Sequence, residues 1–187
     1  MVIDEPTPGG PPVESLVDRL DSWKDIASYM KRDVYEMHIA LESPEQPEVR
    51  TLIEELDAYS NQLSPPESRH QADLATLTKP NVLFAVARGA SGRAIGCAAV
   101  VLFPEFGELK RMYVLPSARG QGAGSAILKY LETEAWLRGC RKLMLETGDQ
   151  HHLAHRTYRA NGFRQRGPFG SYSPDPLSVF MEKEIVD

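Results

Sequence analysis

The chain has 187 residues, of which 42% are hydrophobic, and this suffices to bury the core of one domain. Its 21 basic and 26 acidic residues give a formal net charge of −5, which argues against a nucleic-acid binder held by a basic surface and suits a small or cationic partner. No apolar run approaches the roughly 18 residues of a membrane span, and the N-terminus is acidic and rich in Pro and Gly. We therefore expect a cytoplasmic protein without nucleic-acid or membrane partners.

Residues 1–34 are interpreted as an N-terminal extension. Residues 1–12 hold four prolines and two glycines, which disfavour regular packing. Apolar side chains then recur at spacings of three and four and predict an amphipathic helix; they are Leu16, Leu20, Trp23, Ala27 and Met30. Residues 19–34 resemble the opening of small bacterial helix-turn-helix domains, but a strand-like pattern follows where the recognition helix should be. We therefore interpret the helix as one that docks on the domain or covers a dimer face, and not as part of a DNA-binding motif.

From residue 35 to residue 187 the pattern predicts one domain of mixed helices and strands. In chain order the expected elements are a strand at 35–41, a helix at 47–63, strands at 81–88, 94–104 and 107–115, a helix at 122–138, a strand at 142–146, a helix at 150–160 and a strand at 177–184. The polar loop that follows the first of these helices, up to Asp73, could face a substrate or simply connect two elements. Strands are consecutive in the middle and alternate with helices at the end, so the fold class is α/β, of the α+β kind.

The strongest local signal is a strand, a glycine-rich turn and a helix in succession. The turn reads Arg119, Gly120, Gln121, Gly122, Ala123, Gly124 and Ser125. Glycines let backbone N–H groups approach a phosphate without a Cβ in the way, and the following helix aims the positive end of its dipole at the same place. The spacing differs from that of a Walker loop and of the Rossmann fingerprint. The turn therefore predicts an anion site, with a plain strand–helix connection as the alternative.

Three separated motifs occur in an order that is typical of one family. Arg119-x-x-Gly122-x-Gly124, after a strand that ends in Val-x-Pro, matches the Q/R-x-x-G-x-G/A signature of GNAT acetyltransferases. Residues 143–148 resemble the next strand of that family, residues 154–163 resemble its A-x-x-x-Y-x-x-x-G-F helix end, and residues 169–183 resemble a subgroup of small bacterial members. From about Tyr35 to Ile185 the sequence is therefore identified as a member of the GNAT superfamily.

The resemblance implies a fold and a cosubstrate. The fold would be a mixed, twisted central sheet of about six to seven strands flanked by helices, splayed between strands 107–115 and 142–146. Acetyl-CoA would lie in that cleft, its pantetheine arm pairing with the backbone of residues 112–114 and its pyrophosphate accepting bonds from N–H groups of the glycine-rich turn. The residues expected to bind it are Met112, Tyr113, Val114, Arg119, Gly120, Gln121, Gly122, Ala123, Gly124, Ser125, His151 and Tyr158.

The chemistry implied by the family needs two proton transfers. An alkylammonium group, with a pKa of about 10.4, must lose a proton before its nitrogen attacks a thioester, so a general base is useful. Glu108 resembles the glutamate that serves as base in several GNAT members, although it could equally be a surface carboxylate or bind a cation. Tyr158 matches the family's acid, which protonates the leaving CoA thiolate, and the alternative is a packed helix tyrosine. The predicted catalytic residues are therefore Glu108 and Tyr158.

Two positions depart from the family pattern. His151 stands where an Asn often contacts pantetheine, and Thr157 stands where a Leu usually precedes the tyrosine. His151, His152 and His155 could suggest a metal site, but no Cys or carboxylate lies at ligand spacing, so no metal is expected. A solvated or CoA-facing start of the helix explains these histidines better.

The sequence says least about the molecule that accepts the acetyl group. Scattered carboxylates such as Glu54 and Glu105 could attract an amine, whereas His70, Lys110 and Arg111 could hold the carboxylate of an amino acid. We expect transfer to a primary amine of a small or amino-acid-like molecule. Transfer to a protein or peptide, or acyl-CoA binding by a regulatory module without turnover, are the alternatives. Many GNAT proteins are dimers, so a homodimer is expected from the resemblance.

Overall fold

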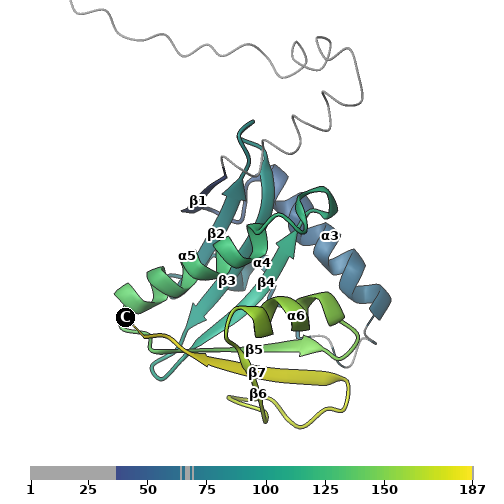
Figure 1. The fold of residues 1–187 in the computed structure, drawn as a ribbon, viewed down its shortest axis with the longest axis vertical. Coiled ribbons are helices and arrows are strands. Elements are labelled where there is room, and N and C mark those ends of the chain that lie inside the picture. Colours follow the sequence, from purple (N-terminus) through teal and green to yellow (C-terminus); the bar gives the residue numbers. More distant parts are fainter. Residues whose placement is uncertain (1–36, 64, 66–67, 69, 187) are drawn as a thin grey trace, which may run out of the picture.

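The computed structural model describes residues 37–63, 65, 68 and 70–186 (Figure 1). The amphipathic helix expected at 16–30 and the domain boundary expected at residue 34 lie outside these residues. The described part forms one seven-stranded sheet in the order β1-β2-β3-β4-β5-β7-β6, with helices packed on it, which confirms the expected mixed α/β fold. The elements are β1 (His38–Leu41), α3 (Pro47–Leu63), α4 (Leu74–Leu77), β2 (Val82–Arg88), β3 (Ala94–Leu102), β4 (Gly107–Val114), the 3₁₀ turn η2 (Pro116–Ala118), α5 (Ala123–Leu137), β5 (Lys142–Gly148), α6 (His152–Ala160), β6 (Arg164–Arg166) and β7 (Ser178–Glu184).

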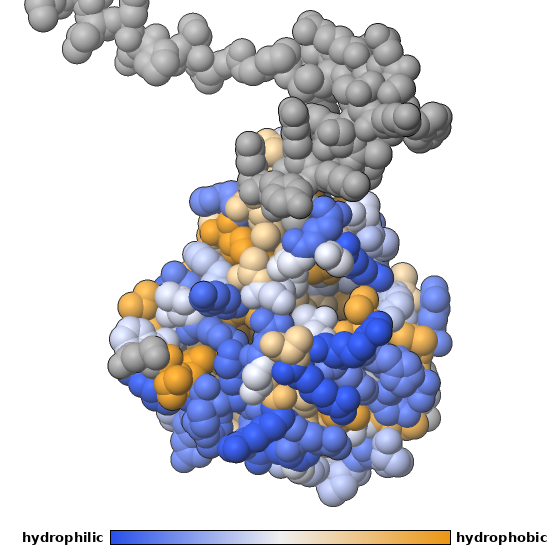
Figure 2. Space-filling model, in the orientation of Figure 1, coloured by the Kyte–Doolittle hydropathy of each residue, from blue (hydrophilic) through white to orange (hydrophobic). Residues whose placement is uncertain are grey.

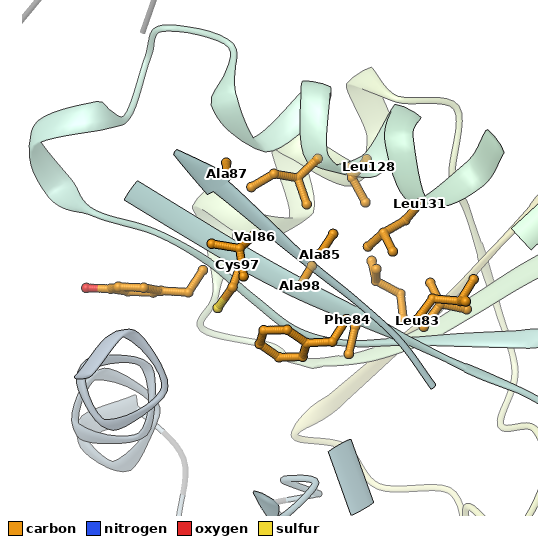
Figure 3. Packing of buried hydrophobic residues seen from close by; sticks show 14 of the residues in the cluster. Leu83, Phe84, Ala85, Val86, Ala87, Cys97, Ala98, Leu128 and Leu131 are labelled. Atoms are coloured by element: carbon orange, nitrogen blue, oxygen red, sulfur yellow. The ribbon is translucent and has the colours of Figure 1, made fainter. Parts of the chain in front are cut away.

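Strands β1 to β4 form an antiparallel meander that is covered on both faces. Strands β2 and β3 are buried along almost their whole length. Helix α5 packs on β2 and β3, and α3 packs on β3 and β4; Figure 3 shows α5 on one side of these strands and α3 on the other. Small residues make this close packing possible, because a Cβ at Gly96 would lie 2.8 Å from the carbonyl oxygen of Tyr113 and 3.1 Å from Ile127. Continuous apolar strands are what burial on two faces requires.

Helix α5 owes its position to one apolar face. Ile127, Leu128, Leu131 and Ala135 are at most 1% exposed, and Figure 3 shows Leu128 and Leu131 pointing towards the strands. The helix ends where Gly139 adopts a φ of +86°, a left-handed conformation that glycine reaches without a steric penalty. The pattern of the sequence thus fixes both the length of α5 and the face it buries.

The sheet divides between β4 and β5. These strands run parallel and pair at three positions only, Gly107 with Leu143, Glu108 with Met144 and Leu109 with Leu145. Beyond them the strands have no further register pairs, so the C-terminal half of β4 presents backbone groups to an open cleft. The expected splay at this place is confirmed. Strand β5 is then fully paired with β7 on its other edge.

A second, smaller core lies beside β5 and β7. Met144, Phe169 and Phe180 are buried there, with Phe106 and Tyr172 packed against them. The rings of Phe169 and Phe180 meet edge to face with their centroids 6.0 Å apart, whereas those of Phe169 and Tyr172 are tilted at 5.0 Å. This core holds the segment between β6 and β7 against the end of the cleft.

Three elements were not expected from the sequence: η2, α4 and β6. Strand β6 has only three residues, Arg-Gln-Arg, whose charged side chains give no apolar alternation; Arg164 and Arg166 instead pair with Glu182 on β7. Helix α4 has four residues and begins where Asp73 accepts a bond from the N–H of Thr76. None of the helices in the described ranges is long and apolar enough to cross a membrane. Figure 2 shows a largely hydrophilic face on which apolar residues form small, separate areas.

Candidate active site

A cavity of about 350 Å³, here named the loop cavity, lies beside the end of β4 that has no partner on β5. Its wall is formed by Leu56, Tyr59, Met112, Tyr113, Val114, Ala118, Arg119, Gly120, Gly122, Ala123, Gly124, Ser125, His151, Leu153, Ala154, Thr157 and Tyr158. The wall thus contains every residue expected to bind the cosubstrate except Gln121, whose exposed side chain donates to the carbonyl of Ser117 at 3.0 Å. Residues of α3, β4, α5 and α6 meet here.

The glycine-rich turn leaves backbone donors free at the start of α5. Gly122 is the N-cap of the helix with a φ of +88°, and no side chain caps the first turn. Gly120 has a φ of +75°, and a Cβ at either glycine would meet nothing within 4 Å, so glycine is needed there for its backbone conformation and not for space. At Gly124 a Cβ would lie 3.2 Å from the terminal methyl group of Met112, a tight contact that this side chain would have to relieve by a small shift. Uncapped N–H groups at a helix start form a ready anion site.

Arg119, the cation of the glycine-rich turn, is hydrogen-bonded to the end of β4. Arg119 donates from Nε to the carbonyl of Val114 at 2.9 Å, and its guanidinium lies over the rings of Tyr59 and Tyr113, 5.8 and 5.6 Å from their centroids. Arg119 therefore joins the end of β4 to α3 while it lines the loop cavity. The sequence predicted a cation near the phosphates, but no pattern in it indicated these contacts of Arg119 with β4 and α3.

A bulge in β4 redirects the backbone at the centre of the cleft. Arg111 has a φ of +57°, and the β3–β4 register shifts between Cys97 and Ala99. The position is unusual for a side chain as large as arginine and is held by long-range contacts: Arg111 donates to the carbonyl of Ala72 at 2.7 Å and forms an ion pair with Asp57. Such strained positions cluster at functional sites. No glycine or proline marks the bulge in the sequence.

Tyr158 stands between two cavities. It is 7% exposed, and it lines both the loop cavity and a smaller one of about 130 Å³, here named the junction cavity, which also contacts Met112, Lys110, His70 and Glu146. Burial, and then the nearby charge of Glu146, raise the pKa of Tyr158 above its ordinary value. Its hydroxyl is therefore fully protonated at neutral pH, although it is a weaker acid than a free phenol.

Glu108 lies apart from Tyr158. It is 7% exposed, and its Oε1 accepts bonds from the hydroxyl of Tyr172 at 2.6 Å and from Nζ of Lys110 at 2.8 Å. Glu108 lines a third cavity of about 900 Å³, here named the outer cavity, together with His70, Lys110, Tyr172 and Asp175, but it contributes to neither of the other two. The two predicted catalytic residues therefore do not face one common cavity.

Glu146 is a site residue that sequence reasoning missed. It lies on β5, is half-buried and lines the junction cavity with Tyr158 and Met112. Ser178 on β7 donates to its Oε1 at 2.7 Å. Burial raises the pKa of Glu146, against the smaller lowering effect of the serine bond. The available signal was a single glutamate directly after the apolar run of residues 143–145, at the end of a strand that borders the cleft.

The histidines of α6 have separate surroundings. His151 is the N-cap of α6, meets the ring of Tyr59 edge-on at 5.6 Å, and lines the loop and junction cavities. Burial, and then His155, lower the pKa of His151, so its imidazole is neutral at pH 7. His155 is buried with its Nε2 bonded to the carbonyl of Gly148 at 2.9 Å. Within the described residues no three His, Cys, Asp or Glu side chains form a group that could hold a metal ion.

Comparison with known proteins decides the family. The model of the Acetyltransferase (GNAT) family matches residues 48–163, which include α3, the cleft and α6. The chain belongs to the GNAT acetyltransferase family. It is 50% identical over 149 residues to a protein of Azospirillum brasilense named IAA acetyltransferase, covering 79% of this chain and 97% of that one.

Solved structures agree with this assignment. A Klebsiella pneumoniae protein assigned as an acyl-CoA N-acyltransferase superposes with a TM-score of 0.72 at 40% identity, covering 80% of this chain and 98% of its own. The PaiA N-acetyltransferase of Thermoplasma acidophilum, solved with coenzyme A, shares the fold with a TM-score of 0.65 at 20% identity and covers 80% of this chain and 99% of its own. The protein is thus an acetyl-CoA-dependent N-acetyltransferase, and the uncapped N–H groups of α5 are a suitable donor set for the pyrophosphate of that cosubstrate.

Proposed function

We propose that this GNAT enzyme transfers the acetyl group of acetyl-CoA to a primary amine of a small or amino-acid-like acceptor by direct attack. The observation that supports this most is a chain of three adjoining cavities. The loop and junction cavities share Met112, His151 and Tyr158, and the junction and outer cavities share His70 and Lys110. A cosubstrate in the first and an acceptor in the last would thus meet beside Tyr158.

In this proposal the chain's own backbone holds the cosubstrate. The N–H groups of Gly122, Gly124 and Ser125 would bind the pyrophosphate, together with that of Gln121, and the unpaired edge of residues 112–114 would pair with the pantetheine arm. The bound thioester supplies an activated acyl carbon. Backbone N–H groups near the bulge at Arg111 would then stabilise negative charge on its oxygen. Tyr158 would give its proton to the departing thiolate.

The charges of the outer cavity favour an acceptor that carries an ammonium group. Glu108 and Lys110 form an ion pair, so their charges largely cancel. Asp175 remains ionised at the rim, because the N–H of Leu177 donates to it at 2.8 Å and lowers its pKa. An amine is attracted to such a surface, and His70 is available to a carboxylate on an amino-acid-like acceptor. The homodimer and the cytoplasmic location expected from the sequence stay predictions.

The test is release of free thiol from acetyl-CoA in the presence of a panel of amino acids, polyamines, arylalkylamines and short peptides. Acetyl-CoA without acceptor is the control for simple hydrolysis. We expect acceptor-dependent release with at least one small amine, and mass spectrometry should show the product heavier by one acetyl group. Release with peptides alone would replace the small acceptor by a protein. No release with any amine, together with tight acetyl-CoA binding in calorimetry, would favour a regulatory binding module.

A further inference from the structure

We propose that Tyr59 of α3 is a binding residue for acetyl-CoA, and that its ring holds the pantetheine arm by joining the two sides of the cleft. This inference rests on one part of the proposed function, the placement of the cosubstrate in the loop cavity. Tyr59 lies outside all of the sequence motifs that identified the family, so neither the motifs nor the fold assigns it a role.

The ring of Tyr59 reaches from one side of the cleft to the other. Its centroid lies 5.8 Å from the guanidinium carbon of Arg119, in the turn after β4, and 5.6 Å from the centroid of the His151 ring, at the start of α6. All three residues line the loop cavity. Figure 1 shows the C-terminal end of α3 beside the start of α6. The three side chains therefore form one continuous wall of the cavity.

Tyr59 also exposes apolar surface at the loop cavity. It is 36% exposed, and Leu153 of α6, which lines the same cavity, is 44% exposed. Large apolar side chains beside a cavity are typical of a binding site, because a ligand removes their surface from water. The pantetheine arm carries methylene groups between its two amides. The ring of Tyr59 can therefore pack on the methylene groups while the backbone of residues 112–114 bonds to the amides.

Helix α3 fixes Tyr59 in this position through two side-chain contacts with β4. The hydroxyl of Tyr113 donates to Glu55 at 2.9 Å, and Arg111 forms an ion pair with Asp57. Tyr113 and the side chain of Arg111 are each 7% exposed, so both contacts anchor the helix to buried groups. A side chain on an anchored helix loses little freedom when a ligand binds, and its contacts then contribute more to affinity.

The position of Tyr59 separates binding from chemistry. Tyr59 lines the loop cavity but not the junction cavity, where the proposed transfer beside Tyr158 would take place. Its contacts with the pantetheine arm are thus the same before and during the transfer. Loss of such uniform binding raises KM and leaves kcat unchanged. We therefore expect variants of Tyr59 to release acetyl-CoA faster without a defect in turnover at saturation.

The experiment compares Tyr59→Ala and Tyr59→Phe with the control Phe103→Ala. Phe103 is an aromatic residue of similar exposure, 43%, and lines none of the three cavities described above. In calorimetry the Kd for acetyl-CoA should rise about tenfold or more in Tyr59→Ala, and by less than about twofold in Tyr59→Phe and in the control. Stopped-flow measurements should assign the rise to faster dissociation. An unchanged Kd in folded Tyr59→Ala would overturn the proposal.

The nucleotide half of CoA separates the pantetheine arm from the phosphates. This fragment keeps the pyrophosphate and lacks the arm, so it should bind at the glycine-rich turn alone. Tyr59→Ala should change its Kd by less than about twofold. A loss as large as the one for acetyl-CoA would mean that Tyr59 acts by orienting Arg119 towards the phosphates, and it would overturn the role at the pantetheine arm.

A double-mutant cycle tests the contact across the cleft. His151→Ala removes the partner of Tyr59 on α6. If the two rings act together, the affinity lost in the double variant should be smaller than the product of the two single losses. Losses that multiply would show that Tyr59 does not act through α6, and they would overturn the claim that it joins the two sides.

Gly122→Asp distinguishes a failure of this inference from a failure of the placement on which it rests. If Gly122→Asp weakens the binding of acetyl-CoA and Tyr59→Ala does not, the cosubstrate lies in the loop cavity and Tyr59 does not bind it. If neither variant weakens binding, the cosubstrate lies elsewhere and both claims fail. These binding measurements need no acceptor, so they hold whichever amine the enzyme uses.

Discussion

The two parts of the sheet are built differently. Strands β1 to β4 are antiparallel neighbours, covered by α5 and α3, and their interior holds most of the main core. Strands β5 to β7 have a small aromatic core of their own and carry α6 beside the cleft (Figure 1). Within the sheet, the two parts meet only where β4 pairs with β5, at the three register pairs from Gly107–Leu143 to Leu109–Leu145.

This difference explains where the site lies. Where pairing between β4 and β5 stops, backbone groups of β4 are left without a strand partner, and a ligand can take that place. The first part supplies a rigid wall and the glycine-rich turn, and the second part supplies Tyr158, Glu146 and Tyr172. We infer that the first part chiefly determines stability and the second part chiefly determines turnover.

The largest expected effect is in the first part. Leu131 on α5 is fully buried, so Leu131→Ala removes buried apolar surface and leaves a cavity. The free energy of unfolding should fall by about 2–5 kcal/mol, as measured by urea denaturation. At a temperature where the variant is folded, its Kd for acetyl-CoA should match that of the wild type. An equal loss of affinity would mean that the two parts are not separable in this way.

The second expected effect is in the second part, and it lowers turnover and not stability. Tyr158→Phe keeps the buried ring but removes the proton donor, so kcat should fall by about 10- to 100-fold with an unchanged Kd for acetyl-CoA. Because burial raises the pKa of Tyr158 above its ordinary value, the wild type should lose no activity from deprotonation of this group below about pH 9. A basic limb that lies below pH 9 and vanishes in Tyr158→Phe would contradict this.

The third effect concerns the glycine-rich turn of the first part, which lines the loop cavity. Gly122→Asp places a carboxylate beside the expected pyrophosphate, and the Kd for acetyl-CoA should rise at least about tenfold in calorimetry. Gly92→Asp is the control: Gly92 has a similar φ of +78° and equally open space, but it lies in the turn between β2 and β3. Both variants carry a similar backbone strain, and only the first should lose affinity. Equal affinities would remove the turn from the binding site.

The smallest effect lies outside both the core and the cleft. Arg138 pairs with Glu134 one helical turn before it at 2.6 Å, on an exposed face of α5. Arg138→Ala should lower the free energy of unfolding by about 0.5 kcal/mol and leave kcat unchanged. A loss above about 2 kcal/mol would show that the end of α5 matters more than its exposure indicates.

Local pattern predicted the fold well. The apolar stripe of α5, the buried runs of β2 and β3 and the glycine-rich turn are all periodic or compositional signals, and each became the expected element. The three-residue strand β6 was missed because Arg164 and Arg166 pair with Glu182, a partner supplied only by the folded chain. The ends of the strands shifted by a few residues for the same reason, since pairing and not propensity sets them.

The binding turn was predictable and the arrangement of the acid–base groups was not. The turn is contiguous, so its motif is visible in the sequence. The Glu108–Tyr172 bond joins residues 64 positions apart, and the Glu146–Ser178 bond joins residues 32 apart. The bulge at Arg111 depends on Asp57 and Ala72, which precede it by 54 and 39 residues. Side-chain bonds at such separations set the surroundings of each carboxylate, and no local pattern encodes them.

A crystal structure of the complex with acetyl-CoA tests the central claim most directly, namely that the cleft between β4 and β5 is the place of transfer. We expect the pyrophosphate against the N–H groups at the start of α5, the pantetheine arm along residues 112–114, and the thioester sulfur within hydrogen-bond reach of the hydroxyl of Tyr158. A cosubstrate that binds outside the cleft, or a thioester on the far side of β4 from Tyr158, would contradict the claim.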